Sequence, residues 1–166
     1  MIEEYRIVHK GAFNIVGFKK RITSQFEGIN PQMAPVIAKL IPEVIAELKG
    51  LCDTEPKGML EISANFSDRL VEGAELDHYI GIATTNAPPD GYDTLKVDES
   101  DWAVFTAVGP FPKSVSETWA RIYAEWLPAS GYELTGAPEM VWYECPDLTN
   151  PDLKTEIWIP VCLITA

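Results

Sequence analysis

The chain has 166 residues, a hydrophobic fraction of 46% and a net charge of −12, which together predict one acidic domain, 1–166, that is large enough for a proper core. The acidic balance argues against binding to nucleic acid or to anionic membrane surfaces, and it is compatible with cationic ligands and with plain solubility. The three Cys and two His lie at no spacing typical of metal ligands, so we expect neither metal nor cofactor. We identify neither a secretory segment nor an apolar run that could span a membrane, so we expect a cytoplasmic protein.

The first half of the chain predicts the element order β-α-β-β. A long apolar stripe predicts a helix that starts at Asn30-Pro31, because Asn caps a helix well and Pro suits its first turn. Pro42 lies inside this stripe, so we expect a kink or a break there. The other parts are expected as strand residues within 6–18, strands at about 58–65 and 76–84, and a Pro-, Gly- and Asp-rich linker at about 86–94.

The second half repeats this order. Three stretches match in sequence: 95–107 with 6–18, 117–128 with 31–42, and 153–162 with 76–85. Repeat one therefore covers about 1–85 and repeat two about 95–166, with its last strands at about 139–144 and 154–163. Because each half has an amphipathic helix that must cover a sheet face, we expect an α+β fold in which two β-α-β-β repeats form a mostly antiparallel sheet with helices on one face.

The strand "TEIWIPVC" near the C-terminus has two unlike faces. Side chains on a strand alternate, so one face is apolar and the other carries Glu156 and Trp158. A solvated face would explain the glutamate and a core face would explain the tryptophan, whereas a pocket explains both. A solvated charge on an edge strand is the competing interpretation for Glu156.

The matching strand at 76–84 is expected to supply the opposite wall of this pocket. In the repeat, Tyr79 falls opposite Glu156 and Gly81 falls opposite Trp158, where a missing side chain would leave room. For the helical residues in the wider set, core packing is the competing interpretation. The further aromatic residues within reach are Trp142, Phe66, Trp119 and Tyr123.

The second half resembles the GyrI-like small-molecule-binding domain, which is also attached to some AraC-type and MerR-type transcription regulators. The resemblance covers 102–161, and its strongest stretches are "TWARIYAEWLPASGYEL" and "EIWIPV". It implies two β-α-β-β units around a pseudo-twofold axis. It also implies an aromatic-lined pocket for lipophilic, often cationic aromatic compounds, with a buried glutamate on the last strand, and Glu156 matches that position.

The physics of such a pocket fits this ligand class. A buried carboxylate without a partner is costly, so an aromatic cation would supply the missing charge. Trp158 and Tyr79 would offer their π faces to the same cation. Broad aromatic walls provide affinity with little hydrogen-bond selectivity, which favours a multidrug type of binding.

Three functions follow from the resemblance. The first is a stand-alone sensor, sequestering protein or effector-binding protein, without nucleic-acid binding of its own and with any protein partner unidentified. The second is a hydrolase that opens strained cyclopropane rings of DNA-alkylating natural products, in which Glu156 acts as general acid or base and Tyr79 orients water. The third is a protein–protein role in which the pocket is vestigial.

Overall fold

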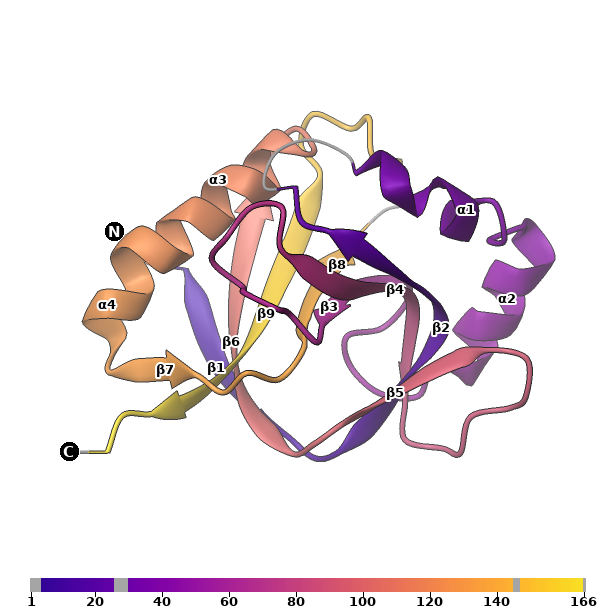
Figure 1. Ribbon diagram of the computed structural model, residues 1–166, viewed down its shortest axis with the longest axis horizontal. Helices are drawn as coiled ribbons and strands as arrows, with labels where there is room; N and C mark the ends of the chain where they lie inside the picture. Colours follow the sequence, from indigo (N-terminus) through magenta and orange to yellow (C-terminus); the bar gives the residue numbers. More distant parts are fainter. Residues whose placement is uncertain (1–3, 26–29, 145–146, 166) are drawn as a thin grey trace.

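The computed structural model describes residues 4–25, 30–144 and 147–165. Each half follows the predicted β-α-β-β order except that two strands, rather than one, precede the helices, and the second half has a short additional strand after them (Figure 1). The elements of the first half are β1 (Tyr5–Lys10), β2 (Phe13–Thr23), η1 (Pro31–Met33), α1 (Ala34–Ile37), α2 (Pro42–Leu51), β3 (Leu60–Ala64) and β4 (Glu75–Thr84). Those of the second half are β5 (Asp93–Val97), β6 (Ser100–Val108), α3 (Lys113–Arg121), η2 (Ile122–Trp126), α4 (Leu127–Ser130), β7 (Tyr132–Leu134), β8 (Glu139–Tyr143) and β9 (Lys154–Leu163).

The helix signals of the first half are confirmed. The Asn30 side chain accepts a hydrogen bond from the backbone N–H of Gln32 and so caps the first turn. The apolar stripe breaks as predicted, because Pro42 begins the separate helix α2 after an extended residue at Ile41. No helix within the described ranges is both long enough and apolar enough to cross a membrane.

Among the described residues, nine strands form one antiparallel sheet in the order β1-β6-β9-β8-β3-β4-β2-β5, with β7 added beside β9. Strands β1, β2, β3 and β4 of the first repeat correspond to β5, β6, β8 and β9 of the second. When these partners are exchanged, the strand order is the same read from either edge of the sheet, which confirms the pseudo-twofold relation. The first strand of each repeat pairs within the other repeat, β1 with β6 and β5 with β2. The two repeats also meet directly, because β3 pairs with β8 at the centre of the sheet.

The curved sheet has an inner and an outer face, and all helices cover the outer one, as predicted (Figure 1). On the outer face, α3, η2 and α4 cover Phe105, Ile157 and Ile159 of the second half, whereas α1 and α2 cover the first half. The inner face is a shared core to which both halves contribute. Its largest buried members are Phe13, Ile15, Leu60, Ile62, Tyr79, Trp102, Met140 and Trp158.

Gly81 contacts the neighbouring strand β2 and does not border a cavity. A Cβ atom at Gly81 would overlap the backbone carbonyl of Val16 and lie 3.0 Å from the Cα of Gly17. The expectation that Gly81 leaves room for a ligand is therefore wrong, because the β2 backbone fills the space that the missing side chain opens.

Replacing Gly81 by Ala should consequently destabilise the fold. The added methyl group meets backbone atoms that cannot rotate away, so we expect the free energy of unfolding to fall by about 2 kcal/mol. Urea denaturation followed by circular dichroism measures the change. Gly11→Ala is the matched control, because a Cβ atom there has nothing within 4 Å, and equal stability of the two variants would contradict the packing argument.

Candidate functional site

Glu156 lies on the inner face of β9 and has a cationic partner. Its side chain is 13% exposed, and its Oε2 accepts a hydrogen bond from Nη1 of Arg6 at 3.0 Å. Its Oε1 accepts a hydrogen bond from Nε1 of Trp158 at 3.3 Å. The expectation of a buried carboxylate without a partner is therefore wrong at Glu156. Arg6 is 150 residues away in the sequence and comes close only because β1 pairs within the second half.

The aromatic residues predicted beside Glu156 share its face of the sheet, but they belong to the core. Trp158 is 1% exposed and Tyr79 is also buried, while Trp142 donates its indole N–H to the carbonyl of Lys57 at 2.7 Å. A cavity of about 320 Å³ is lined by Trp158 together with the end of β1, the turn that follows it, Thr54, Glu55 and Thr85. A second cavity of about 220 Å³ lies beside Arg6. The closed inner core therefore leaves little aromatic surface open near Glu156.

The other predicted aromatic residues lie on the outer face, where one of them, Tyr123, contacts a different carboxylate. Tyr123, in the π-helical segment η2, donates its hydroxyl to Oε1 of Glu139 at 2.6 Å. Trp119 stacks on Tyr123 with ring centroids 5.7 Å apart and an interplanar angle of 11°, and it also packs against the core under α3. We call Phe66, Arg69, Trp119, Tyr123 and Glu139 the Glu139 cluster.

Arg69, in the loop between β3 and β4, completes this cluster. Its Nη1 lies 2.5 Å from Oε1 of Glu139, and its Nη2 donates to the carbonyl of Ala137 at 3.0 Å. The guanidinium carbon is 4.6 Å from the centroid of the Phe66 ring, which is within the range of a cation–π interaction. The carboxylate is therefore held by one cation, one phenol and a wall of aromatic rings.

Burial dominates the electrostatics of the Glu139 cluster. The Glu139 side chain is 7% exposed, and this desolvation raises the pKa of its carboxyl although Arg69 and Tyr123 both act to lower it. Burial and the neighbouring carboxylate together raise the pKa of the Tyr123 phenol. The phenol therefore stays protonated and remains a hydrogen-bond donor to Glu139.

A second carboxylate, Glu61, lies on the same face of the adjacent strand β3. Tyr143 donates its hydroxyl to Glu61, and Nε2 of His78 lies 3.7 Å from Oε1 of Glu61. Burial acts to raise the pKa of Glu61, but His78 and Tyr143 outweigh it and hold the pKa below its usual range. Nδ1 of His78 is in turn 3.0 Å from the hydroxyl of Ser63. Two carboxyl groups with opposite pKa shifts thus share the outer face where the repeats meet.

Sequence reasoning found the rings of the Glu139 cluster but not its carboxylate. Glu139 is the first residue of β8 and follows a proline, a position typical of an exposed strand end. It is buried because the loop that carries Arg69 and the helix that carries Tyr123 both extend over it. The alternation of Glu139, Val141 and Tyr143 is the one local signal, since it resembles the glutamate–aromatic alternation of β9. Within the described ranges, no group of His, Cys, Asp and Glu side chains is arranged to hold a metal ion.

Comparisons with known proteins agree with the architecture. SAV2435, solved with bound tetraphenylphosphonium, is 22% identical and superposes with a TM-score of 0.73 over 96% of this chain and 94% of its own. The EcmrR C-terminal domain is 13% identical, with a TM-score of 0.64 over 99% of this chain and 100% of its own. A hydrolase encoded by lin2189 of Listeria innocua is 16% identical, with a TM-score of 0.55 over 97% of this chain and 93% of its own.

These structural similarities establish a shared fold. A sequence search of curated proteins gave no match. The family model described as the GyrI-like small molecule binding domain, by contrast, matches residues 3–161. That match spans both β-α-β-β repeats, including the strand exchange that joins them. The chain therefore belongs to the GyrI-like family of small-molecule-binding domains.

Proposed function

We propose that this protein binds hydrophobic aromatic cations at the Glu139 cluster, as a sensor, a sequestering protein or an effector-binding protein. The single observation that carries the proposal is a carboxylate that is 7% exposed, bonded to the Tyr123 phenol and already paired with a cation that lies over the Phe66 ring. A site that holds a guanidinium in this way has the charge and the rings needed to hold another organic cation.

The interactions available at the cluster suit aromatic cationic ligands. A cation over an aromatic ring gains about 0.5–2 kcal/mol per ring, more when water is excluded, and a buried carboxylate interacts strongly with a positive charge. Aromatic walls impose few hydrogen-bond requirements, so several ligands of one class can bind. Tetraphenylphosphonium, the ligand of SAV2435, is an aromatic cation, and this supports the choice of ligand class.

The inner site around Glu156, with Trp158, Tyr79, Gly81 and Trp142, is the competing location. The rings of Trp158 and Tyr79 are buried in the core, Trp142 is partly buried with its indole N–H already bonded, and the carboxylate bonds to Arg6. The rings of Phe66, Trp119 and Tyr123 are only partly buried. A ligand at Glu139 therefore requires less of the core to be opened, which favours the outer site.

Two substitutions distinguish the sites. Glu139→Gln removes the charge but keeps the shape, so we expect rhodamine 6G and tetraphenylphosphonium to bind about 30-fold or more weakly. Glu156→Gln is the matched control and should leave both affinities within about threefold. Fluorescence polarisation and calorimetry measure the dissociation constants. The reverse result, a loss in Glu156→Gln alone, would assign binding to the inner site.

The affinity for cations should also depend on pH through Glu139. Because desolvation raises the pKa of this carboxyl, its charge is fully present above that pKa and is lost as the pH falls through it. We expect affinity for tetraphenylphosphonium, whose charge does not titrate, to fall by up to about tenfold per pH unit below the pKa. In Glu139→Gln this dependence should disappear. An identical pH profile in the variant would show that another group is responsible.

A hydrolase that uses Glu61 and Glu139 on the outer face is the second candidate function, and the opposite pKa shifts of these two carboxyl groups favour it. Groups whose environments move their pKa values apart are suited to act as base and acid. The ionised Glu61 would take a proton from a water molecule while the water oxygen attacks a ring carbon of the cyclopropane. Protonated Glu139 would donate a proton to the substrate oxygen that gains negative charge as the C–C bond breaks. The Listeria innocua relative is described as a hydrolase.

Turnover of a cyclopropane-containing alkylator tests this second function. Ultraviolet absorbance follows loss of the cyclopropane chromophore, and either Glu61→Gln or Glu139→Gln should slow turnover by about 10²–10⁴-fold. Glu156→Gln and Tyr79→Phe test the inner-face assignment of the catalytic residues, and we expect both to retain wild-type rates. Wild-type rates in Glu61→Gln and Glu139→Gln would exclude these two residues as the catalytic pair, and no turnover by the wild type would leave binding as the function.

A further inference from the structure

We propose that Arg69 is a tethered competitor that occupies the place of the ligand's cation, so that ligands bind by exchange with it. This inference rests on the proposed function, since it concerns the regulation and selectivity of the same site. It assigns the loop from Asn65 to Ala74, here called the Arg69 loop, a role that its own sequence does not suggest.

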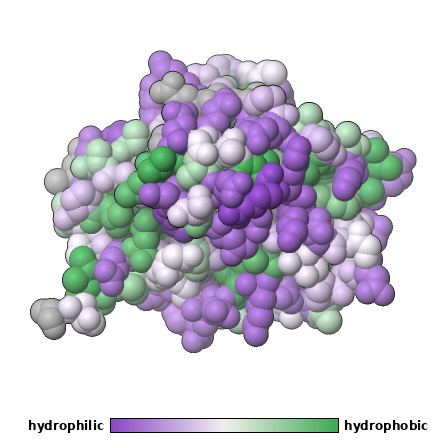
Figure 2. Space-filling view, in the orientation of Figure 1, coloured by the Kyte–Doolittle hydropathy of each residue, from purple (hydrophilic) through white to green (hydrophobic). Residues whose placement is uncertain are grey.

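Arg69 makes the kinds of contact that a bound aromatic cation would need. Its guanidinium lies 2.5 Å from the Glu139 carboxylate and 4.6 Å from the Phe66 ring centroid. Its side chain is only 12% exposed, although it belongs to a loop that crosses the surface of the molecule. Figure 2 shows hydrophilic residues gathered at the centre of this face, where the loop crosses it in Figure 1. The cation site is therefore filled from within by a residue of the other repeat.

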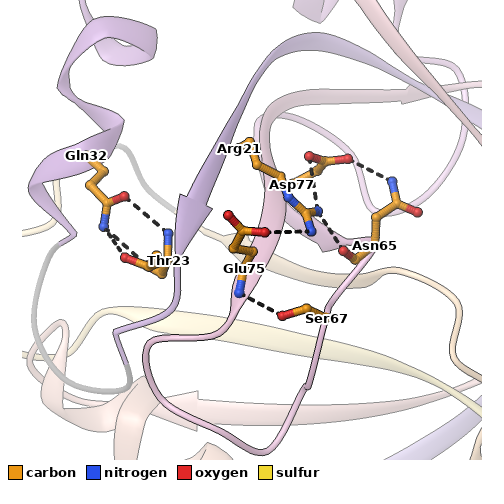
Figure 3. A network of polar contacts seen from close by, with 7 residues as sticks. All are labelled: Arg21, Thr23, Gln32, Asn65, Ser67, Glu75 and Asp77. Carbon is orange, nitrogen blue, oxygen red and sulfur yellow. Dashed lines mark hydrogen bonds and ion pairs between the residues drawn. The ribbon is translucent and has the colours of Figure 1, made fainter.

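The base of the Arg69 loop is fixed to the first half by a polar network (Figure 3). Arg21 donates to the backbone carbonyl of Asn65 at 2.7 Å and pairs with Asp77 at 3.4 Å. Asn65 donates to the other oxygen of Asp77 at 2.8 Å, and the backbone N–H of Glu75 donates to the Ser67 hydroxyl at 2.9 Å. These bonds hold both ends of the loop without involving Arg69, so the guanidinium can leave Glu139 while the base stays in place.

The tip of the loop carries apolar side chains beside Arg69. Leu70 is 67% exposed and Val71 is 51% exposed. They follow Arg69 directly, so a loop that releases the guanidinium carries them with it. Their aliphatic surface is then available to cover a hydrophobic ligand that has taken the place of Arg69.

Exchange with Arg69 makes the site selective for cations. When a monocation enters and the guanidinium leaves, the charge within the cluster is unchanged and Glu139 remains paired. A neutral aromatic compound of the same shape cannot displace Arg69 without leaving a buried carboxylate unpaired, which is strongly unfavourable. The cost of displacing Arg69 also lowers every cation affinity, because only the fraction of molecules with the loop released can bind.

Arg69→Gln tests the proposal. At pH 8, which favours the ionised form of Glu139, we expect rhodamine 6G to bind at least about tenfold more tightly than to the wild type, because the competitor is absent. Arg121→Gln is the matched control: Arg121 lies on the exposed side of α3 and pairs with Glu125, so the variant changes the net charge equally and should bind as the wild type does. Unchanged or weaker dye binding in Arg69→Gln, with normal binding in the wild type, overturns the proposal.

Hydrogen exchange in the unmodified protein gives a second readout that does not depend on a variant folding. Dye binding should accelerate exchange at the Leu70 amide, which donates to Asp68 within the tip, and leave the Gly73 amide protected by its bond to the Ser24 carbonyl. Unchanged protection at Leu70 in the dye complex overturns the proposal. If neither the wild type nor Arg69→Gln binds the dye, the proposed function fails and this inference fails with it. If both bind the dye with the same affinity, the inference alone is overturned.

Discussion

The pairing of β3 with β8 is the contact on which the candidate site depends. It joins the two repeats at the centre of the sheet and sets Ser63 opposite Glu139. Because directly paired residues share a face, this register brings the outer-face polar groups of both repeats into one row. Helix α3 approaches this row from the second half and the Arg69 loop approaches it from the first. Together they enclose the Glu139 carboxylate where the two repeats meet.

Both glutamates that matter here are paired with arginines of the other repeat. Arg6 of β1 reaches Glu156 on the inner face, and Arg69 reaches Glu139 on the outer face. Both arginines come from the first half and both glutamates from the second. Removing one partner of a buried pair leaves an uncompensated charge, so these contacts hold the repeats in one relative position as well as neutralising the carboxylates.

The difference between the two pairs lies in how they are held. Arg6 belongs to a strand whose backbone is bonded along its length to β6, so its backbone is fixed although its side chain is half exposed. Arg69 belongs to a loop whose base is anchored by the network around Arg21 and whose far end is bonded to Ser24 through Val71 and Gly73. A loop of this kind opens locally at low free-energy cost compared with a strand, which makes the outer pair the one suited to exchange with a ligand.

The sequence by itself determined the repeat, the element order, the break at Pro42 and the alternation that divides β9 into two faces, because periodicity and helix capping are local properties. It also identified Trp119, Tyr123 and Phe66 as candidate ring contacts. Only the tertiary structure decided which carboxylate those rings surround and which arginine neutralises each glutamate. The physical reason is that charge compensation acts across space: the exchange of β1 between repeats and the reach of one loop over β8 depend on the register of distant strands, which no local pattern encodes.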